Sequence, residues 1–382
     1  MKKLKILQVT KLYWPWIGGV EDHVQCIADN LKDDFDISVL ACQEPSPSSS
    51  FFFAGDPSVI NGVKVWKVPS FGIYLSMPIA PRFPFWLSRL AKDADILHFH
   101  MPFPIAVMSY RVLRLKKKVV ITWHSDIIRQ KWANSILAPF SKFLMDRASV
   151  ILPTSGRLIK SSDLLQKYED KCRAVSLTID PGKYKLTRSL EEEVRLLRDR
   201  NHNAPLILFI GRVVPYKGVE YLVRALPSLK RKARLLLVGS GPLRRDLEDL
   251  AIDLGVASRI EFSGAISDEE LLSYYHACDC FVLPSVMNNE AFGIVQLEAM
   301  ACGKPVINTN LPTGVPGVSV NGETGITVEP GDPVALANAI NSLIENKELA
   351  RKYGSNGRKR VIGNFSDPVL KREISKIYHN LR

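Results

Sequence analysis

Short apolar runs alternate with amphipathic stretches along most of this 382-residue chain. The runs have the length of buried strands, and the stretches, for example residues 20–31 and 243–254, space their apolar residues as one face of a helix does. Such alternation is typical of βαβ units, whose strands form a parallel sheet. The apolar runs lie at residues 5–9, 37–41, 63–68, 96–100, 119–122, 150–153, 206–211, 234–238, 260–262, 280–283 and 305–308.

The alternation breaks once, at residues 181–204, where the chain is charged and poor in apolar residues. We therefore predict an α/β protein of two doubly wound, Rossmann-like domains that face each other across a cleft. Their expected limits are 1–182 and 204–367, with a connection at 183–203. The amphipathic segment 368–382 is expected to pack back on the first domain as a helix. Ligands of such sheets bind beyond the carboxyl ends of the strands, so residues that follow a strand are the first candidates for a site.

Cysteine usage and hydropathy bear on the cellular compartment. The six cysteines form no Cys-x-x-Cys pair and lie among apolar residues, which is typical of reduced thiols in the cytoplasm. The first apolar run, residues 6–9, is too short for the core of a signal peptide, and no run reaches the roughly 18 residues of a membrane span. We therefore expect a cytoplasmic protein, and leave open a peripheral contact with the inner face of the cytoplasmic membrane.

The formal net charge of +12 is unevenly distributed. Residues 1–185 hold 26 Lys and Arg against 16 Asp and Glu, whereas the rest of the chain is nearly balanced. A basic domain fits an anionic membrane surface, a phosphate-bearing substrate or a nucleic acid. The basic run 111–118 and the amphipathic stretch 131–147, which includes Phe140 and Phe143, suit a membrane surface. An ordinary core-facing helix with a basic rim explains the same stretch equally well.

Two glycine-rich segments follow strands of the second domain. In Gly-Arg-Val-Val-Pro-Tyr-Lys-Gly, residues 211–218, the cations Arg212 and Lys217 stand at the start of a helix, where amides and the helix dipole suit a diphosphate. The second segment, residues 239–242, places Gly241 where the backbone can approach a ligand closely. Neither segment matches a P-loop or a dinucleotide fingerprint. Read alone, each is as compatible with a plain turn as with a ligand site.

A pair of glutamates, Glu290 and Glu298, borders a further predicted helix start. We expect the first in a loop and the second in the helix, with Phe292 and Gly293 offering free amides where the helix opens. Carboxylates are good acceptors for sugar or ribose hydroxyls. The apolar neighbours of Glu298 argue against simple surface exposure, and an unpaired buried carboxylate would be costly. The pattern therefore favours a functional pair over two surface glutamates.

The loop after the first strand of the chain contains two tryptophans and ends in two glycines. Gly18 and Gly19 allow backbone amides to meet a phosphate at the start of the first helix. Trp14 and Trp16 could stack on a sugar or contact lipid head groups. A packed loop is the alternative interpretation.

A polar cluster follows the strand at residues 119–122. Trp123, His124 and Asp126 end this strand in the basic half of the chain. Triad partners normally come from separate elements, so hydrogen bonding to a polar ligand is the better interpretation of His124 than a catalytic triad. His98 and His100 share one face of their strand, and we interpret them as structural because no third metal ligand is near in sequence.

Together these motifs resemble the retaining glycosyltransferases of family 4, which have the GT-B fold, over nearly the whole chain. The resemblance rests on the Gly-Arg…Lys-Gly segment followed by the Glu-x7-Glu pair. It implies that Arg212 and Lys217 hold the diphosphate of a nucleotide-sugar and stabilise the leaving group. Glu290 would face the transferred hexose and Glu298 the ribose hydroxyls. It also implies a catalytic role for His124 and acceptor contacts at Trp123 and Asp126. The residues that it implies as donor contacts are Gly18, Gly19, Gly241, Ile266, Phe292, Gly293, Ile294 and Val295.

Residues 122–131 and 311–319 resemble more narrowly the bacterial mannosyl- and rhamnosyltransferases of O-antigen and exopolysaccharide assembly. This implies a GDP-sugar donor, favoured over a UDP-sugar, and a lipid-linked saccharide acceptor. We expect no metal, no cofactor and no nucleic-acid partner, since the two cations replace the metal at the diphosphate. The alternatives are a UDP-sugar-dependent transferase of the same fold, a nucleotide-sugar epimerase and a non-catalytic sugar-nucleotide binder.

Overall fold

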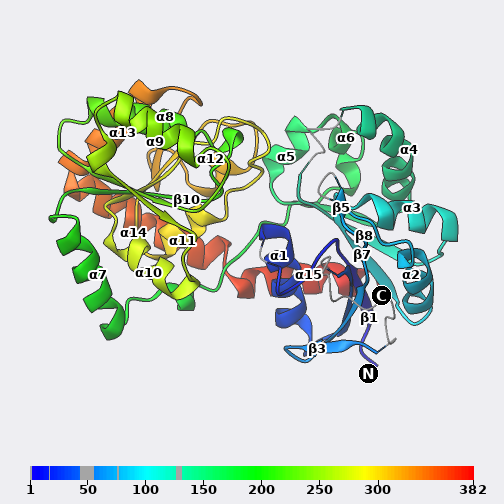
Figure 1. Cartoon of the computed structure of the whole chain (residues 1–382). Coiled ribbons are helices and arrows are strands. Elements are labelled where there is room, and N and C mark those ends of the chain that lie inside the picture. The colour runs from blue at the N-terminus through cyan, green and yellow to red at the C-terminus, as the bar shows by residue number, and fades with distance from the viewer. Residues whose placement is uncertain (1, 17, 44–55, 75–76, 126–130) are drawn as a thin grey trace. The chain divides into compact units, whose positions relative to one another are not determined.

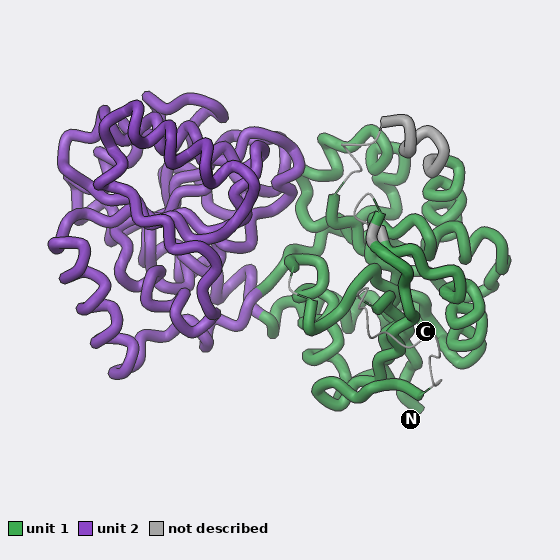
Figure 2. The backbone as a smooth tube through the Cα atoms, viewed as in Figure 1, with its two compact units in different colours: residues 1–178, 367–382 green, residues 179–366 purple. Residues whose placement is uncertain are grey.

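The computed structural model describes residues 2–16, 18–43, 56–74, 77–125 and 131–382. The chain divides into two compact units (Figure 2). Each unit has its own sheet, which is parallel in unit 2 and mainly parallel in unit 1. Unit 1 comprises Met1–Thr178 and Asp367–Arg382, and unit 2 comprises Ile179–Ser366.

Unit 1 is built on a seven-stranded sheet in the order β3-β4-β2-β1-β7-β8-β9. Neighbouring strands run parallel, except that β3 pairs antiparallel with β4. Helices α1 and α15 cover one face of the sheet, and α2, α3 and α4 cover the other (Figure 1). The elements are β1 (Lys5–Val9), α1 (Gly19–Leu31), β2 (Asp36–Cys42), β3 (Ser58–Ile60), β4 (Val63–Val68), β5 (Ile73–Tyr74), β6 (Met77–Pro78), α2 (Phe83–Ala91), β7 (Ile96–Met101), α3 (Pro104–Leu113), β8 (Lys118–Trp123), α4 (Lys131–Arg147), β9 (Val150–Pro153), α5 (Gly156–Ser161), α6 (Asp163–Gln166), η1 (Glu169–Lys171) and α15 (Asp367–Asn380).

Successive side chains of the central strand β1 point to opposite faces of this sheet. Leu7 and Val9 join the core beneath α2, α3 and α4, whereas Ile6 lies in the core beneath α1 and α15. Because both faces are covered, the central strands are apolar almost throughout, and this made them recognisable as short apolar runs. Gln8 is an exception, since it is fully buried on the α1 and α15 face.

Unit 2 has an all-parallel six-stranded sheet in the order β12-β11-β10-β13-β14-β15, which is the strand order of a doubly wound nucleotide-binding sheet. Helices α8, α9 and α13 cover one face, and α7, α10, α11 and α14 cover the other (Figure 1). The elements are η2 (Pro181–Tyr184), α7 (Arg188–Arg200), β10 (Leu206–Ile210), η3 (Pro215–Lys217), α8 (Val219–Ala225), η4 (Leu226–Ser228), β11 (Arg234–Val238), α9 (Arg244–Asp253), η5 (Ala257–Arg259), β12 (Ile260–Gly264), α10 (Asp268–Ala277), β13 (Cys280–Leu283), α11 (Val295–Ala301), β14 (Val306–Thr309), α12 (Val315–Val318), β15 (Gly325–Val328), α13 (Pro333–Glu345) and α14 (Lys347–Asn364).

The segment expected as a connection, residues 183–203, instead contains α7 and belongs to unit 2. Helix α7 buries only Leu190 and Leu197, and its other side chains are largely charged and exposed. This narrow apolar stripe explains why the segment looked like a linker in the sequence.

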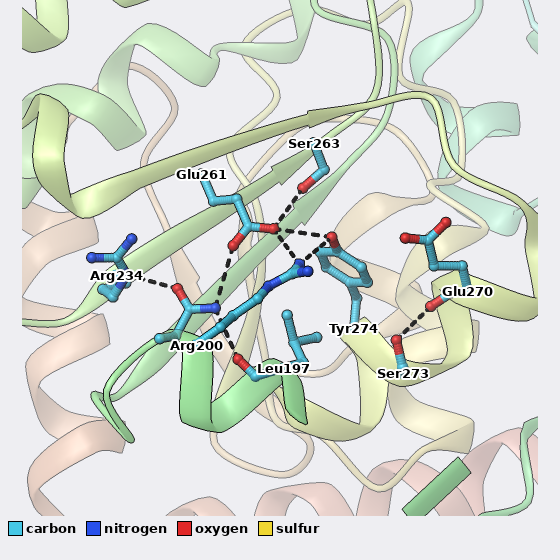
Figure 3. A network of polar contacts seen from close by, with 9 residues as sticks. Leu197, Arg200, Arg234, Glu261, Ser263, Glu270, Ser273 and Tyr274 are labelled. Carbon is cyan, nitrogen blue, oxygen red and sulfur yellow. Dashed lines mark hydrogen bonds and ion pairs between the residues drawn. The ribbon is translucent and has the colours of Figure 1, made fainter. Parts of the chain in front are cut away.

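A polar network holds the end of α7 against the edge strand β12 (Figure 3). Arg200 Nη2 donates to Glu261 Oε1 at 2.6 Å, and the hydroxyl of Tyr274 on α10 donates to the same oxygen at 3.0 Å. Asn201 Nδ2 donates to Glu261 Oε2 at 3.3 Å, and Ser263 Oγ donates to Oε1 at 3.1 Å. One carboxylate thus joins three elements of unit 2.

The last helix of the chain, α15, belongs to unit 1 rather than to the unit that precedes it in sequence. Lys371 Nζ lies 2.9 Å from Asp34 Oδ2, and Leu370, Ile374 and Tyr378 are buried in the core shared with α1. The chain passes from one unit to the other at residues 178–179 and 366–367, whereas the sequence analysis placed the end of the first domain at residue 182.

Across the described residues, the structure contains no helix with the length and apolar character that crossing a membrane requires.

Candidate active site

At the carboxyl ends of β10 and β11 two loops pack backbone against backbone. A Cβ atom on Gly239 would lie 2.0 Å from the carbonyl oxygen of Gly211, and one on Gly241 would lie 2.2 Å from that of Val213. Gly239 also has a φ of +128°, which residues with a side chain rarely adopt. Gly241, predicted as a donor contact, therefore has a structural role in unit 2 as well.

Lys217 ends the short helix η3 and is buried beside these loops. Its Cε and Nζ lie 3.5 Å from where a Cβ on Gly211 would be, so the side chain runs along the glycine backbone. The ammonium group lies 2.5 Å from Glu290 Oε2. Two residues predicted for the site from separate motifs are thus in direct contact.

Glu290 lies in the loop after β13 and is 8% exposed. Its Oε2 accepts a hydrogen bond from Ser285 Oγ at 3.0 Å in addition to the contact with Lys217. The hydroxyl of Thr313 donates to the main-chain carbonyl of Glu290 at 2.7 Å, and Thr309 Oγ1 donates to that of Ser285 at 2.6 Å. The carboxylate is therefore held in place from both sides of the loop.

Arg212 has a different environment from Lys217, although both come from the loop after β10. Its guanidinium is exposed, and Nη2 donates to the hydroxyl of Tyr216 at 3.1 Å. It thus keeps most of its five N–H donors for a ligand. Of the two cations, Lys217 is compensated by a carboxylate and Arg212 is the one directed to solvent.

The start of α11 offers main-chain donors close in sequence to Glu290. Among the described residues, the amides of Phe292, Gly293, Ile294 and Val295 have no hydrogen-bond acceptor. Gly293 has a φ of +74°, and a Cβ there would come within 2.6 Å of Leu283 Cδ2. The turn that leaves these amides without acceptors therefore needs glycine at residue 293.

Glu298 lies inside α11 and is partly buried. The hydroxyl of the fully buried Tyr275 on α10 donates to Glu298 Oε2, and Tyr184 of η2 makes a further side-chain hydrogen bond to this carboxylate. Burial, with the nearby carboxylate, raises the pKa of both phenols. Sequence reasoning missed the two tyrosines, because neither lies in a motif and their meeting depends on how η2, α10 and α11 pack.

Unit 1 carries the remaining predicted residues, beginning with the glycines at the start of α1. A Cβ on Gly18 would meet Glu21 Oε2 at 2.5 Å, whereas one on Gly19 would have no atom within 4 Å. A side chain at residue 18 would therefore require the Glu21 carboxylate to shift, whereas one at residue 19 would displace nothing. Trp14 and Trp16, in the same loop, are 52% and 36% exposed.

The cluster after β8 separates into parts with different surroundings. Trp123 is the last residue of β8 and is buried in the core beneath α2, α3 and α4, which assigns it a structural role. His124 is 6% exposed and lies on the other face, where His100 Nδ1 is 3.2 Å from its Nε2. Asp126 lies outside the described residues.

Ile266 follows β12 by two residues and is partly buried, at the same carboxyl edge of the unit 2 sheet as Arg212 and Glu290. Throughout the described parts of the chain, no group of three or more His, Cys, Asp or Glu side chains could hold a metal ion.

Comparison with known proteins identifies the family of this chain. The model of Glycosyltransferase Family 4 matches residues 17–181, and the model of Glycosyl transferases group 1 matches residues 192–360. The D-rhamnosyltransferase WbpZ of Pseudomonas aeruginosa is 31% identical over 274 residues, which are 71% of this chain and 70% of that protein. The chain is a family 4 glycosyltransferase.

A second relative of this glycosyltransferase is the O-antigen chain mannosyltransferase C of Escherichia coli, 26% identical over 94% of this chain and 93% of that protein. The crystal structure of HepE from Anabaena, in complex with UDP, matches the glycosyltransferase with a TM-score of 0.81 at 20% identity, over 99% of this chain and 100% of that one. The predicted family, the predicted GT-B fold with two Rossmann-like sheets, and the predicted enzyme class are confirmed.

Proposed function

We propose that this glycosyltransferase transfers mannose or rhamnose from a GDP-sugar to a lipid-linked saccharide in cell-surface polysaccharide biosynthesis, with retention of configuration and without a metal ion. The observation that carries the proposal is the group formed by Arg212, the Lys217–Glu290 pair and the open amides of α11 at one edge of the unit 2 sheet. The printed names of the relatives, a D-rhamnosyltransferase and an O-antigen chain mannosyltransferase, support the choice of sugar and acceptor.

In this proposal the diphosphate of the donor meets two cations and a row of amides. Arg212 supplies an exposed guanidinium, whose fork matches phosphate oxygens. Lys217 adds a second positive charge, shared between Glu290 and the diphosphate. These fixed groups stabilise the negative charge that develops on the leaving diphosphate, as a bound metal ion does in metal-dependent enzymes.

Retention by two displacements needs a carboxylate that attacks the anomeric carbon. Glu290 is the carboxylate that the family resemblance puts at the hexose, but its Oε2 is already bound by Lys217 and Ser285. A carboxylate held in this way is suited to accept hydrogen bonds from sugar hydroxyls. We therefore infer that the acceptor attacks on the face from which the nucleotide leaves, through an ion-pair-like state.

The proposed lipid-linked acceptor calls for a surface that can approach a membrane. On the neighbouring helices α2 and α3, Phe85, Met108 and Val112 are 61%, 44% and 74% exposed. Arg82 directly precedes α2, and Arg111 lies on α3. Such a mixture of apolar and basic side chains suits an anionic membrane surface.

Helix α4, the amphipathic stretch singled out in the sequence, is less suited to this role in the part whose side chains are described. Phe140 and Phe143 pack against the core of unit 1, and the guanidinium groups of Arg111 and Arg147 cover the ring of Phe143 at 4.4 and 4.8 Å from its centroid. This favours a core-facing helix with a basic rim.

The donor is tested by thermal unfolding with GDP, UDP and ADP, because a ligand that binds the native state raises its stability. We expect the largest rise in unfolding temperature with GDP, followed by release of GDP from GDP-mannose or GDP-rhamnose. A UDP-sugar is the second candidate, since HepE was crystallised with UDP. A larger rise with UDP than with GDP would replace the proposed donor.

A further inference from the structure

The face of the unit 1 sheet beneath α1 and α15 contains a continuous chain of buried polar side chains. Its members come from the neighbouring strands β1, β7 and β8, from the residue after β8 and from the C-terminal helix. None is more than 6% exposed, and each link is 3.2 Å or shorter. In order, the chain runs through His124, His100, Gln8, Tyr378, His98 and Thr122.

The direction of the hydrogen bonds near His124 follows from Gln8, whose amide donates only from Nε2 and accepts only at Oε1. His100 Nε2 lies 2.6 Å from Gln8 Oε1 and therefore carries the proton of that bond. Burial, with the neighbouring rings, lowers the pKa of His100 well below its ordinary value, so the ring is neutral and its Nδ1 is bare. His124 Nε2, 3.2 Å from this Nδ1, is then the donor.

The other half of the chain is consistent with this orientation of the Gln8 amide. Gln8 Nε2 donates to the hydroxyl of Tyr378 at 2.9 Å. That hydroxyl donates to His98 Nδ1 at 2.7 Å, which leaves the proton of His98 on Nε2, 2.8 Å from Thr122 Oγ1. Each of the five links thus joins one donor to one acceptor, and reversing the amide of Gln8 would require protons to move on three histidines.

We propose that Gln8, His100 and Tyr378 are positioning residues that hold His124 as the Nε2–H tautomer, so that its Nδ1 accepts a hydrogen bond from a hydroxyl of the bound sugar. The inference rests on the proposed function and on the contact with the sugar that the family resemblance implies for His124. Among the described residues Nδ1 of His124 has no partner, and a hydroxyl can donate to it. The returning helix α15 would then contribute to the site through Tyr378.

The surroundings of His124 also indicate a functional network rather than a packing feature. An apolar core at these positions would avoid the desolvation of so many polar groups. His23 on α1 sets its ring edge-on to His124, with centroids 5.4 Å apart, and its Nδ1 is buried without a hydrogen-bond partner. Such an orphaned group costs about 1–3 kcal/mol. A buried group without a partner calls for an explanation, and a catalytic role is one of those known.

The tautomer can be read directly by nitrogen NMR of the full-length protein carrying ¹⁵N-labelled histidine rings. The seven histidines give few signals, and the signals of His124 are those lost in His124→Asn. We expect a protonated Nε2 and a bare Nδ1 in the free wild-type protein. A protonated Nδ1 on His124 would overturn the proposal.

Two variants test whether the chain causes this tautomer. Tyr378→Phe removes one hydroxyl and keeps the ring, whose edge contact with Phe35 remains, and Gln8→Met removes both amide groups at similar length. Both should give a mixture of tautomers at His124 and lower the release of GDP from GDP-mannose about tenfold, since misplaced groups cost rate. Stabilisation by GDP should persist in both, because neither substitution alters Arg212, Lys217 or the amides of α11, which are the contacts proposed for the diphosphate in unit 2.

Tyr168→Phe is the matched control. It removes a hydroxyl that donates to Asp146 Oδ1 at 2.6 Å, in the same unit but outside the chain. It should leave the His124 signals and the turnover as in the wild type. Unchanged signals in Tyr378→Phe and Gln8→Met would overturn the proposal. The proposed function is tested by a different measurement: if it is wrong, GDP will not stabilise the wild-type protein. The tautomer of His124 is measured in the free protein and does not depend on that result.

Discussion

Lys217 and Glu290 form a buried ion pair in unit 2, with Nζ 2.5 Å from Oε2 and side chains only 11% and 10% exposed. Each residue belongs to a different sequence motif, and each was predicted to contact a different part of the donor. Their contact means that, without a donor, the charge of Lys217 is matched by a carboxylate. In the proposed function, a donor diphosphate therefore shares Lys217 with Glu290, whereas Arg212, which is exposed, meets it directly.

The first prediction concerns Glu290→Gln, which keeps an acceptor for Lys217 and Ser285 but removes the negative charge. We expect GDP to stabilise the variant at least as much as the wild type, because Lys217 loses its competing partner. Transfer should fall about 10²-fold, as on loss of one well-placed polar group. The free energy of unfolding should drop by up to about 3 kcal/mol, since the buried cation loses the negative charge of its partner.

The control for this variant is Glu345→Gln, which removes the exposed pair of Glu345 with Lys230 in the same unit. It should change the unfolding free energy by less than about 1 kcal/mol and leave transfer unaffected. Wild-type transfer in Glu290→Gln would remove Glu290 from the sugar site.

The second prediction is that Arg212→Ala weakens GDP binding about tenfold to a hundredfold, because charge-assisted hydrogen bonds contribute about 1.5–3 kcal/mol. Arg212→Lys should recover only part of the affinity, since it keeps the charge but not the bidentate fork. Isothermal titration with GDP gives the affinities. The control is Arg231→Ala, which removes an exposed arginine before β11, at the opposite edge of the sheet. An equal loss of GDP affinity in this variant would mean that only net charge matters.

The third prediction separates the two glycines at the start of α1. Gly19→Ala should fold as well as the wild type or better, by up to about 1 kcal/mol, because its Cβ would meet no atom and alanine favours a helix. Transfer should nevertheless fall if the backbone here approaches a phosphate. Gly18→Ala should be less well tolerated than Gly19→Ala, since its Cβ would lie 2.5 Å from Glu21 Oε2 and the Glu21 side chain would have to shift. Full transfer by Gly19→Ala would show that Gly19 does not touch the donor.

The contrast between these residues shows what the sequence could predict. Arg212, Lys217 and Glu290 follow strands in loops that contain glycine, so local patterns were enough to make them candidates for the site. The contacts of Tyr275 and Tyr184 with Glu298 were not predicted, because they depend on helix packing and neither tyrosine lies in a motif. The two sheets were predictable because strands covered on both faces are apolar throughout.

The errors and omissions have the same physical origin. Helix α7 was mistaken for a connection because its apolar stripe is narrow, and its attachment to unit 2 depends on Glu261, far along the chain. His98 was interpreted as structural from one strand alone. Its bond to Tyr378, which is the link from β7 to α15, joins residues 280 positions apart. Local periodicity contains no information about such pairs.

The fourth prediction tests the proposed membrane contact of unit 1. The double variant Phe85→Ser and Val112→Ser removes two large exposed apolar side chains and should fold normally, because neither contributes to the core. In sedimentation with anionic vesicles, the wild type should bind and the variant should bind at least several-fold less. Neutral vesicles should bind both weakly. Equal recovery of the wild type with anionic vesicles and without vesicles would reject the contact.

The last prediction concerns acid stability and follows from the four buried histidines of unit 1. Burial lowers the pKa of His23 to about 4 and that of His98 to about 3, and it also lowers the pKa values of His100 and His124 well below the ordinary value of 6.5. The rings face one another, so each proton taken up would also repel the next.

The unfolded chain binds these protons near pH 6.5 and the native chain does not. The contribution of the four histidines to the free energy of unfolding is therefore fully present above pH 6.5. It is lost as the pH falls from there toward 4, by about 1.4 kcal/mol per pH unit for each histidine. Thermal unfolding followed by circular dichroism at pH 7.5, 6 and 5 should show this loss. His23→Leu should reduce the slope by about one proton, and because His23 Nδ1 has no partner, the variant should be more stable than the wild type at pH 5. An unfolding temperature that stays constant from pH 7.5 to pH 5 would contradict the expected neutral cluster.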